Sequence, residues 1–514
     1  MSKESADLIL YNADVLTMNL RQPRVELVAV RDGKIVWVGD KDGLDLFDGR
    51  KVDCAGRTVA PGFNDAHLHI FAYASALLSV DCSPAEVTSI SDIQVRIRQQ
   101  AERMPPGTWI KAVGYNEFYL VEGRHPTRHD LDIAAPYHPV KLSHRSQHAC
   151  VLNSLGLSLA GITIETPEPS GGLIDRDLET AEPSGLLFGM NSHISDKVIP
   201  PLGEQELGEG IKLANRSFLS FGITSVQDAT VSNGFVQWQT LKSLKERGEL
   251  APRVCMMFGM DALVDFRERG MGAGFGDSEL KLGMVKIVIG QAKGNLNPPQ
   301  EELNREVIQA HEAGFQVAIH AIEETSVAAA ITALEYCRCQ FPETSSRHRV
   351  EHCSECPPEL LRRLSKAGAV VVTQPSFIYY SGERYSHTVS EQQLPWLYRV
   401  RSFMEGGLRP AASSDCPVVP PNLLVGIYAA VTRRAENGQE LLPEEAVTPA
   451  QALEMYTIGG AYASFEEGFK GSIEVGKAAD LVILSADPTA VPLEEISDIR
   501  VDRTIINGKV VWER

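Results

Sequence analysis

Two histidines stand one residue apart in the segment PGFNDAHLHI, where an apolar stretch ends. Residues i and i+2 of an extended strand point to the same side, so the imidazoles of His67 and His69 are expected to face one spot. Neutral imidazole is the commonest metal ligand among side chains, so the pair could begin a metal site. Taken alone, the HxH pair fits equally well two partly exposed histidines in a turn.

Other short apolar runs also end in residues that could carry out chemistry. These are GITSVQDA with Gln227 and Asp228, GMVKIVIG with Lys286, FQVAIHAI with His320, HRVEHC with His352, AVVVTQPS with Gln374 and RPAASSDCPV with Asp415. With RVCMMFGM and the run before His67 they make eight candidate strands. Most neighbours are separated by roughly 20–40 residues, enough for one crossover helix each. Eight such units predict an α/β fold of the TIM-type (β/α)8 barrel.

In such a barrel the carboxyl ends of all strands meet at one mouth, which would bring these distant side chains together. Several imidazoles with a carboxylate suit zinc, iron or cobalt and are a poor site for calcium. The sequence therefore predicts one or two divalent metals, with zinc first and iron, cobalt or manganese as alternatives. The candidate metal residues are His67, His69, Lys286, His320, His352 and Asp415.

A lysine in this set needs a reason, because an ammonium group has no lone pair. Burial would lower the pKa of Lys286, and the neutral amine could then capture carbon dioxide as a carbamate. The two carbamate oxygens could bridge two metals. The alternative is a lysine that balances the charge of Asp415 or binds a substrate oxygen.

Both ends of the chain read as β-structure, with hairpin turns at Asp32-Gly33 and Asn507-Gly508. Each end is too small to bury a core alone, so we expect one composite β-sandwich from both. About 150 residues separate the first two barrel strands, far more than a normal loop. The expected domains are residues 1–60 with 466–514 for the sandwich, 61–80 with 215–465 for the barrel, and 81–214 for an insertion.

The composition argues against some classes of partner and says little about a small-molecule substrate. A net charge of −18 argues against nucleic acid or an anionic membrane surface as partner. The N-terminal MSKESADLIL lacks the features of a secretory signal, and no run approaches the roughly 20 apolar residues of a membrane helix. Nine cysteines, an odd number, suit reduced thiols. We therefore expect a cytoplasmic location.

Taken together, the ordered motifs resemble those of the amidohydrolase superfamily, within it the amidohydrolase-3 group that includes N-substituted formamide deformylases. The matching stretches span the chain and include GRTVAPGFNDAHLHI, SGGLIDRDLETAEPSGLL, FGITSVQDA, VAIHAI, RVEHC, TQPS, SSDCPV and GSIEVGKAADLVIL. The resemblance implies a distorted barrel, a composite sandwich and a long insertion after strand one. It also implies a metal site at His67, His69, His320, His352 and Asp415, with Lys286 where related two-metal enzymes use a carboxylated lysine. A homodimer is compatible with it.

The expected reaction is hydrolysis of an amide-type C–N bond of a small molecule by metal-activated water. Asp415 would act as general base, and the metal or His352 would polarise the carbonyl. Candidate substrate-binding residues are His148 in QHACVLN, Gln374 and Glu323.

Two other interpretations remain open. His320-Ala-Ile-Glu323 has the HxxE spacing of cytosine-type deaminases in the superfamily, which suggests a one-metal deaminase of a heterocyclic amine. Glu323 could instead be a carboxylate favoured by a helix N-terminus. A non-catalytic scaffold would be expected to have lost ligands, and none is missing from the motifs.

Overall fold

The computed structural model describes residues 3–169, 171–292, 295–342 and 345–514. The chain divides into two compact units. The first contains residues 1–69, 215–290 and 298–514, and the second contains 70–214 and 291–297. Over the described ranges, no helix combines the length and the apolar character needed to cross a membrane.

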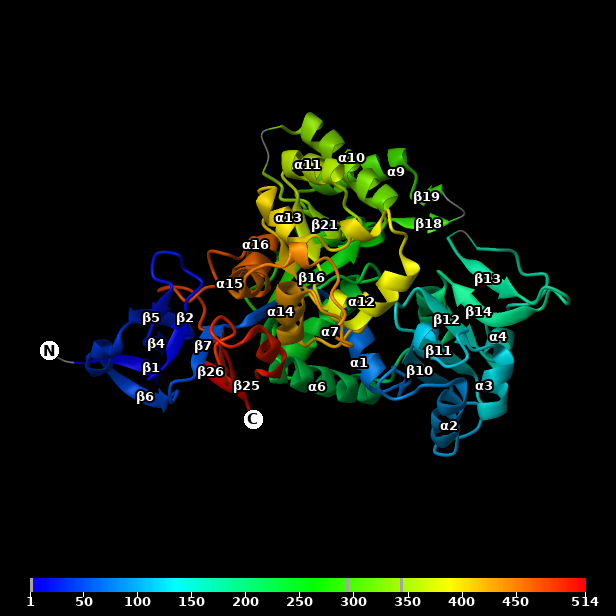
Figure 1. Ribbon diagram of the computed structural model, residues 1–514, viewed down its shortest axis with the longest axis horizontal. Helices are drawn as coiled ribbons and strands as arrows, with labels where there is room; N and C mark the ends of the chain where they lie inside the picture. Colours follow the sequence, from blue (N-terminus) through cyan, green and yellow to red (C-terminus); the bar gives the residue numbers. More distant parts are fainter. Residues whose placement is uncertain (1–2, 170, 293–294, 343–344) are drawn as a thin grey trace. The chain divides into compact units, whose positions relative to one another are not determined.

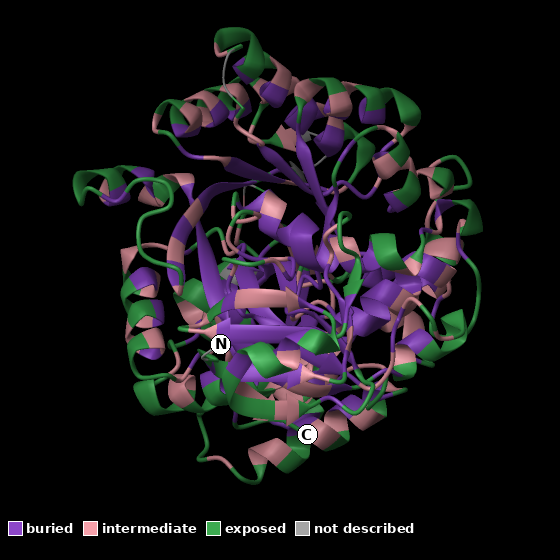
Figure 2. Cartoon of the chain, turned by 90° about the vertical axis from the view of Figure 1, so that its left-hand side faces the viewer, coloured by how far each residue is buried: buried purple, intermediate pink, exposed green. Residues whose placement is uncertain are grey.

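An eight-stranded sheet forms the centre of the first unit, in the order β23-β22-β21-β20-β17-β16-β15-β8, and its paired neighbours run parallel. Its strands are β8 (Phe63–Leu68), β15 (Ile223–Asp228), β16 (Arg253–Gly259), β17 (Leu280–Val288), β20 (Val317–Ala321), β21 (Arg349–His352), β22 (Val370–Thr373) and β23 (Ala411–Ala412). Seven of them lie within the predicted runs, and β17 begins three residues before the run GMVKIVIG, so the predicted barrel is confirmed. The strands are buried almost throughout, as expected for a sheet covered by helices (Figure 2).

Two backbone hydrogen bonds close this sheet at its carboxyl edge. The amide of Asp415 donates to the carbonyl of His67 over 2.9 Å, and the amide of His69 donates to the carbonyl of Cys416 over 2.9 Å. The end of the first strand is thereby held against the segment that follows the last strand. Both predicted histidines of the HxH pair lie at this closure.

Helices cover the barrel strands. They are α7 (Phe235–Glu246), α8 (Leu263–Glu268), α9 (Gln300–Glu312), α10 (Glu324–Gln340), α11 (Pro358–Ala367), α12 (Ser376–Thr388), α13 (Val400–Glu405), α14 (Leu423–Thr432), α15 (Pro449–Glu454) and α16 (Gly460–Ala463), with short turns η4 (Met260–Ala262), η5 (Leu394–Trp396), η6 (Pro443–Glu445), η7 (Met455–Gly459) and η8 (Leu493–Asp498). Helices α9, α10 and α11 lie side by side outside β20 and β21 (Figure 1). α11 shows how the sequence sets the two ends of a helix. It has a proline in its first turn, and Gly368, whose φ is +69°, caps its C-terminal end.

The two chain ends share a sheet in the first unit. β24 (Leu481–Leu484), from the C-terminal part of the chain, pairs antiparallel with β7 (Thr58–Pro61), and the sheet has the order β26-β25-β24-β7-β2-β3. Strands of both chain ends, among them β7 and β25, lie close together in Figure 1. The other members are β2 (Asp14–Leu16), β3 (Arg24–Val25), β25 (Val501–Ile506) and β26 (Lys509–Glu513). A second sheet, β5-β4-β1-β6, contains β1 (Glu4–Tyr11), β4 (Leu27–Arg31), β5 (Lys34–Gly39) and β6 (Phe47–Asp53), with η1 (Lys41–Leu46) beside it. Leu10, Val30, Leu481 and Ile505 belong to one apolar core, which joins the two sheets into the expected composite sandwich.

The second unit is built on a six-stranded sheet of order β13-β14-β12-β11-β10-β9. Its elements are α1 (Ile70–Leu77), β9 (Val80–Asp81), α2 (Ile90–Ala101), β10 (Ile110–Tyr115), η2 (Glu117–Tyr119), α3 (Arg128–Ala134), β11 (Val140–His144), β12 (Ala149–Leu152), α4 (Ser154–Leu159), β13 (Leu173–Arg176), β14 (Pro183–Phe188), α5 (Asn191–His193) and η3 (Ile194–Val198). α6 (Glu204–Ser220) runs from this unit into the first, and β18 (Gly290–Ala292) pairs with β19 (Asn295–Asn297). The insertion expected at residues 81–214 lies inside the second unit, which includes residues 70–80 as well.

A buried ion cluster ties β17, the strand of Lys286, to the chain after α16. The Glu466 carboxylate lies 3.3 Å from Lys281 Nζ and 2.9 Å from Lys470 Nζ, and accepts a hydrogen bond from Ser464 Oγ over 2.7 Å. Burial by itself would raise the pKa of Glu466, but the two lysines and the hydroxyl lower this pKa to about 2. The ionised carboxylate therefore stabilises the fold at neutral pH.

We expect Glu466→Gln to lower the free energy of unfolding by roughly 3 kcal/mol at pH 7, the value of the pKa shift. Because the folded-state pKa lies below the unfolded value, this contribution is complete above about pH 4.5 and is lost as the pH falls toward 2. Thermal unfolding of the wild type and of Glu466→Gln between pH 7 and pH 3 measures this difference in stability. The exposed Glu405→Gln is the matched control, and a difference that grows on acidification would contradict the prediction.

Candidate metal centre

The HxH pair and the strand-eight aspartate meet at the closed edge of the barrel. Asp415 Oδ1 lies 3.5 Å from His67 Nε2 and 3.3 Å from His69 Nε2. One ligand atom from each of these three residues lies within 4.8 Å of the others. His67 and Asp415 are buried, whereas the side chain of His69 is 26% exposed. The cluster is thus open on the side of His69.

His352 joins the cluster through a local break in strand geometry. Its ring centroid lies 4.9 Å from that of His67 and 4.4 Å from that of His320. The preceding residue, Glu351, also reaches His67, although consecutive strand residues normally point to opposite faces. The φ of His352 is +66°, which interrupts the alternation. Asp415 has a φ of +57°, so two of the cluster residues adopt the left-handed conformation that non-glycine residues rarely take.

Hydrogen bonds on the far side of the rings set which nitrogen faces the cluster. His352 Nδ1 lies 2.8 Å from Gln374 Oε1, and the Gln374 amide donates to Ser413 Oγ over 2.9 Å. An amide oxygen only accepts, so Nδ1 of His352 carries the proton and Nε2 keeps its lone pair. His69 Nδ1 lies 2.9 Å from Thr230 Oγ1, which leaves Nε2 toward Asp415. This arrangement is typical of metal-binding histidines.

Burial keeps the rings of His67 and His352 neutral, and the surroundings of Asp415 keep its carboxylate charged. Burial lowers the pKa of His67 well below its usual value and also lowers the pKa of His352. Burial would raise the pKa of Asp415, but the hydrogen bond from His69 and the neighbouring histidines hold it well below its usual range. Neutral imidazoles and an ionised carboxylate are the forms that bind a metal.

Lys286 belongs to the same cluster. Its side chain is buried on β17, and Nζ lies 3.5 Å from His67 Nε2. Burial lowers the pKa of Lys286 to about 8, against the opposing effect of Glu351 and Asp415. The structure thus brings together all six predicted metal residues. Their imidazole nitrogens and carboxylate oxygens fit a divalent metal of the zinc type.

Two of the three predicted substrate-binding residues make other contacts, and the third belongs to the second unit. Gln374 is fully buried and bonded to His352 and Ser413. Glu323 is exposed at the start of α10, and its carboxylate accepts a hydrogen bond from Ser326 Oγ over 3.3 Å. His148 is exposed in the turn between β11 and β12 of the second unit. The role of each stays a prediction.

The sequence did not reveal that Thr230 and Glu351 contact the Nδ1 atoms of His69 and His67. Thr230 follows β15 by two residues, and Glu351 stands directly before His352. A signal for Glu351 was available, since two charged residues, Arg349 and Glu351, stand in one strand of a sheet expected to be buried, and a charged residue is rarely buried without a specific partner. Thr230 gave no such signal, because threonine is ordinary near the end of a strand.

The geometry can now be compared with known proteins. A sequence model of the amidohydrolase family matches residues 50–512. The chain belongs to the amidohydrolase family. The predicted resemblance is confirmed, and with it the expectation of a hydrolase acting on carbon–nitrogen bonds other than peptide bonds.

Two relatives illustrate how far the likeness extends. N-substituted formamide deformylase of Arthrobacter pascens is 29% identical over 538 aligned positions, which cover 99% of this chain and 98% of the relative. The crystal structure of an uncharacterized metal-dependent hydrolase from Pyrococcus horikoshii superimposes with a TM-score of 0.76 at 25% identity, covering 95% of this chain and 99% of that chain. These likenesses support a divalent metal in this amidohydrolase.

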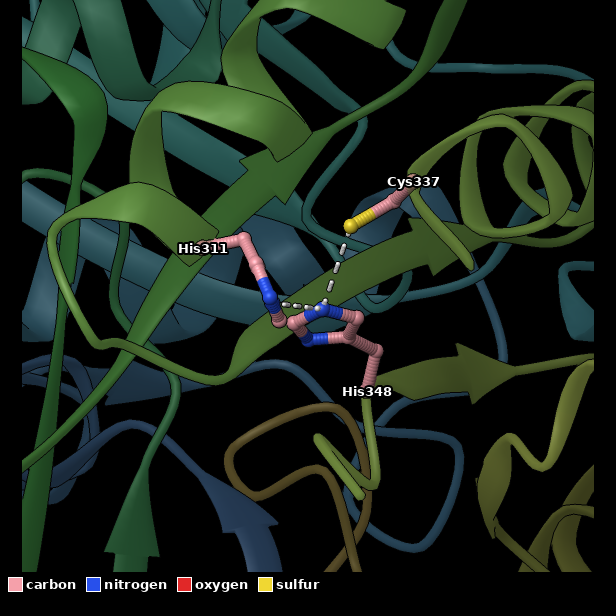
Figure 3. Close-up of side chains that lie close together, drawn as sticks. All are labelled: His311, Cys337 and His348. Carbon is pink, nitrogen blue, oxygen red and sulfur yellow. Dashed lines mark hydrogen bonds between the residues drawn. The ribbon is translucent and has the colours of Figure 1, made fainter. Parts of the chain in front are cut away.

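A second group of potential ligands lies among the helices. His311 on α9, Cys337 on α10 and His348 before β21 point toward one another (Figure 3). His348 Nε2 lies 3.1 Å from His311 Nδ1 and 3.8 Å from Cys337 Sγ. By distance alone these atoms could hold a metal.

The hydrogen bonds of His348 favour a different interpretation. The backbone amide of Val317 donates to His348 Nδ1 over 3.0 Å, so in the neutral ring the proton sits on Nε2. Burial lowers the pKa of His348 to about 3, which keeps the ring neutral, and raises the pKa of the Cys337 thiol to about 11. Nε2–H then donates to His311 Nδ1 and has no lone pair for a metal. The group is a hydrogen-bonded packing cluster.

We therefore expect Cys337→Ala to bind as much zinc per chain as the wild type, whereas His69→Ala loses zinc. Elemental analysis after incubation with zinc and gel filtration measures the content. If Cys337→Ala lost one zinc ion per chain and His69→Ala kept its zinc, the metal site would instead be the cluster of His311, Cys337 and His348.

Proposed function

We propose that this amidohydrolase cleaves the amide-type C–N bond of a small N-acyl amine, with an N-formyl amine as the first choice of substrate. The observation that carries the proposal is the convergence of His67, His69, His352 and Asp415 around Lys286 at the barrel mouth. The N-formyl choice is supported by the full-length likeness to the formamide deformylase.

The metal is proposed to be zinc, held by the histidines and Asp415. When bound, it would supply a water of lowered pKa and a Lewis acid for the scissile carbonyl. Lys286 fits as a carbamate, because a buried amine 3.5 Å from His67 Nε2 cannot itself be a ligand while protonated. Its two oxygens would give the site a second metal position.

Asp415 is proposed to take a proton from the attacking water and to pass it to the nitrogen of the leaving amine. Its carboxylate is ionised, faces the same space as His69 Nε2, and can accept a proton from water through Oδ1. The same oxygen can return the proton to the nitrogen of the leaving amine, which departs as a neutral molecule. Before that step the water oxygen bonds to the formyl carbon, and the C–N bond breaks as the nitrogen takes the proton. The other product is formic acid, which then loses its proton to solvent and becomes formate.

His352 is proposed as a ligand rather than as a donor to the carbonyl oxygen. Its Nδ1–H is used by Gln374, and burial keeps the ring neutral. The remaining Nε2 has a lone pair and no proton to offer to an oxyanion. This differs from the expectation that His352 polarises the carbonyl.

The deaminase alternative has less support in the geometry. A proton-shuttling glutamate should face the reacting atoms, whereas Glu323 is exposed and bonded to Ser326 at the start of α10. Assay of a panel of N-alkyl formamides, their N-acetyl counterparts and heterocyclic amines separates the two functions. Release of formate and a primary amine is the expected result, and release of ammonia from a heterocyclic amine would overturn it.

We expect Asp415→Asn to lower kcat by about 100-fold or more, the usual effect of losing a general base, while zinc remains bound. Steady-state kinetics and metal analysis of the same preparation measure both quantities. Asp487→Asn, a buried aspartate in the terminal sandwich, is the control. Near-normal turnover of Asp415→Asn would rule out this base.

We further expect the wild type in ¹³C-labelled bicarbonate to give a carbamate carbon signal by NMR, together with two zinc ions per chain. Lys286→Arg should lose the signal and one zinc ion, because a guanidinium does not capture carbon dioxide. Lys141→Arg is the matched control, since burial also lowers the pKa of Lys141. One zinc ion and no carbamate signal in the wild type would favour a one-metal hydrolase.

A further inference from the structure

A buried carboxylate contacts the Nδ1 edge of His67, the first histidine of the HxH pair. Glu351, on β21, has no exposed surface, and its Oε2 closely contacts Nδ1 of His67. The contact joins residues 284 positions apart in the sequence and lies on the ring edge opposite the atom that faces Asp415. None of the predicted roles accounts for it.

The chemistry of this contact fixes the state of the His67 ring. An ionised carboxylate only accepts hydrogen bonds, so Nδ1 carries the proton and donates it toward Glu351. Nε2 then keeps its lone pair, and this atom lies 3.5 Å from Asp415 Oδ1 and 3.5 Å from Lys286 Nζ. The corresponding partners of His69 and His352 are the neutral side chains of Thr230 and Gln374.

We propose that Glu351 is a positioning residue that holds His67 in the tautomer and orientation required to bind the divalent metal. The inference rests on the metal centre of the proposed function. A carboxylate partner makes the ring a stronger ligand than a neutral partner does, and it also prevents the ring from turning. His67 is also the most deeply buried of the rings of His67, His69 and His352.

Arg349 holds the carboxylate in place. Its Nε donates to Glu351 Oε1 over 2.7 Å and its Nη2 donates to Glu351 Oε2 over 2.9 Å. Nη2 also donates to the carbonyl of Ala66 over 2.8 Å, and Nη1 to the side chain of Gln227. The guanidinium therefore links β21 to β8 and β15. It also holds the Glu351 carboxylate next to His67, the residue that follows Ala66.

Arg349 also raises the competing explanation, that Glu351 serves merely to neutralise a buried arginine. Removing Glu351 alone would leave that charge unpaired and could unfold the protein for an unrelated reason. A double variant that removes both charges distinguishes the two explanations. If neutralisation were the whole role, the double variant would recover zinc binding together with the fold.

The test compares the wild type, Glu351→Gln and the double variant Arg349→Met/Glu351→Met as full chains. The zinc dissociation constant is measured by competition with a chromophoric chelator, and folding by circular dichroism. We expect both variants that fold to bind zinc about 10–100-fold more weakly than the wild type, the usual effect of losing the outer partner of a ligating histidine. The absorption spectrum of bound cobalt should also change, because His67 is no longer held in one orientation.

Asp480→Asn supplies the control for general destabilisation. Asp480 is buried and paired with the buried Arg253 over 2.6 Å, in the same unit but outside the cluster. It should lose thermal stability and keep its zinc affinity. Wild-type zinc affinity in the folded Glu351→Gln or in the folded double variant would overturn the inference.

The outcomes also separate this inference from the proposed function. If the wild type binds no zinc or other divalent metal at the barrel mouth, the metal centre itself fails, and the inference with it. If the wild type binds zinc and the Glu351 variants bind it equally well, the positioning role alone is wrong. Equal loss of affinity in Asp480→Asn would assign the effect to general destabilisation and would likewise overturn the positioning role.

Discussion

The closure of the barrel between β8 and the segment after β23 is the constraint on which the site depends. Two backbone hydrogen bonds, from Asp415 to His67 and from His69 to Cys416, hold the first and last strands together at their carboxyl ends. Because His67, His69 and Asp415 are proposed ligands, the bonds that complete the sheet also bring the candidate metal centre together. Backbone hydrogen bonds therefore bring these side chains together without any contribution from a metal.

Around this closure, each histidine is oriented by a different outer partner. Thr230 and Gln374 follow β15 and β22, and Glu351 lies on β21, so each ring depends on a neighbouring or opposite strand for its orientation. Two ligand positions, His352 and Asp415, adopt positive φ values that the surrounding barrel must stabilise.

Much of the fold and of the site could be predicted from the sequence. Each of the eight apolar runs became a barrel strand, because continuous apolar runs separated by helix-length segments have few other solutions. The proximity of the proposed ligand residues followed from this, since a barrel collects strand ends at one mouth. The outer partners could not be found in this way, because which side chains meet across a barrel depends on strand tilt and on local breaks such as the one at His352.

The sequence by itself determined the fold class, the pairing of the two chain ends and the residue types of the metal centre, because hydrophobic pattern and turn residues are local properties. Tertiary structure decided which nitrogen of each ring faces the metal, that Glu323 lies exposed at a helix start, and that Glu351 stands behind His67. It also decided that His311, Cys337 and His348 form a hydrogen-bonded cluster, since one backbone amide, that of Val317, fixes the His348 proton. Proton positions follow from three-dimensional contacts, which residue spacing does not encode.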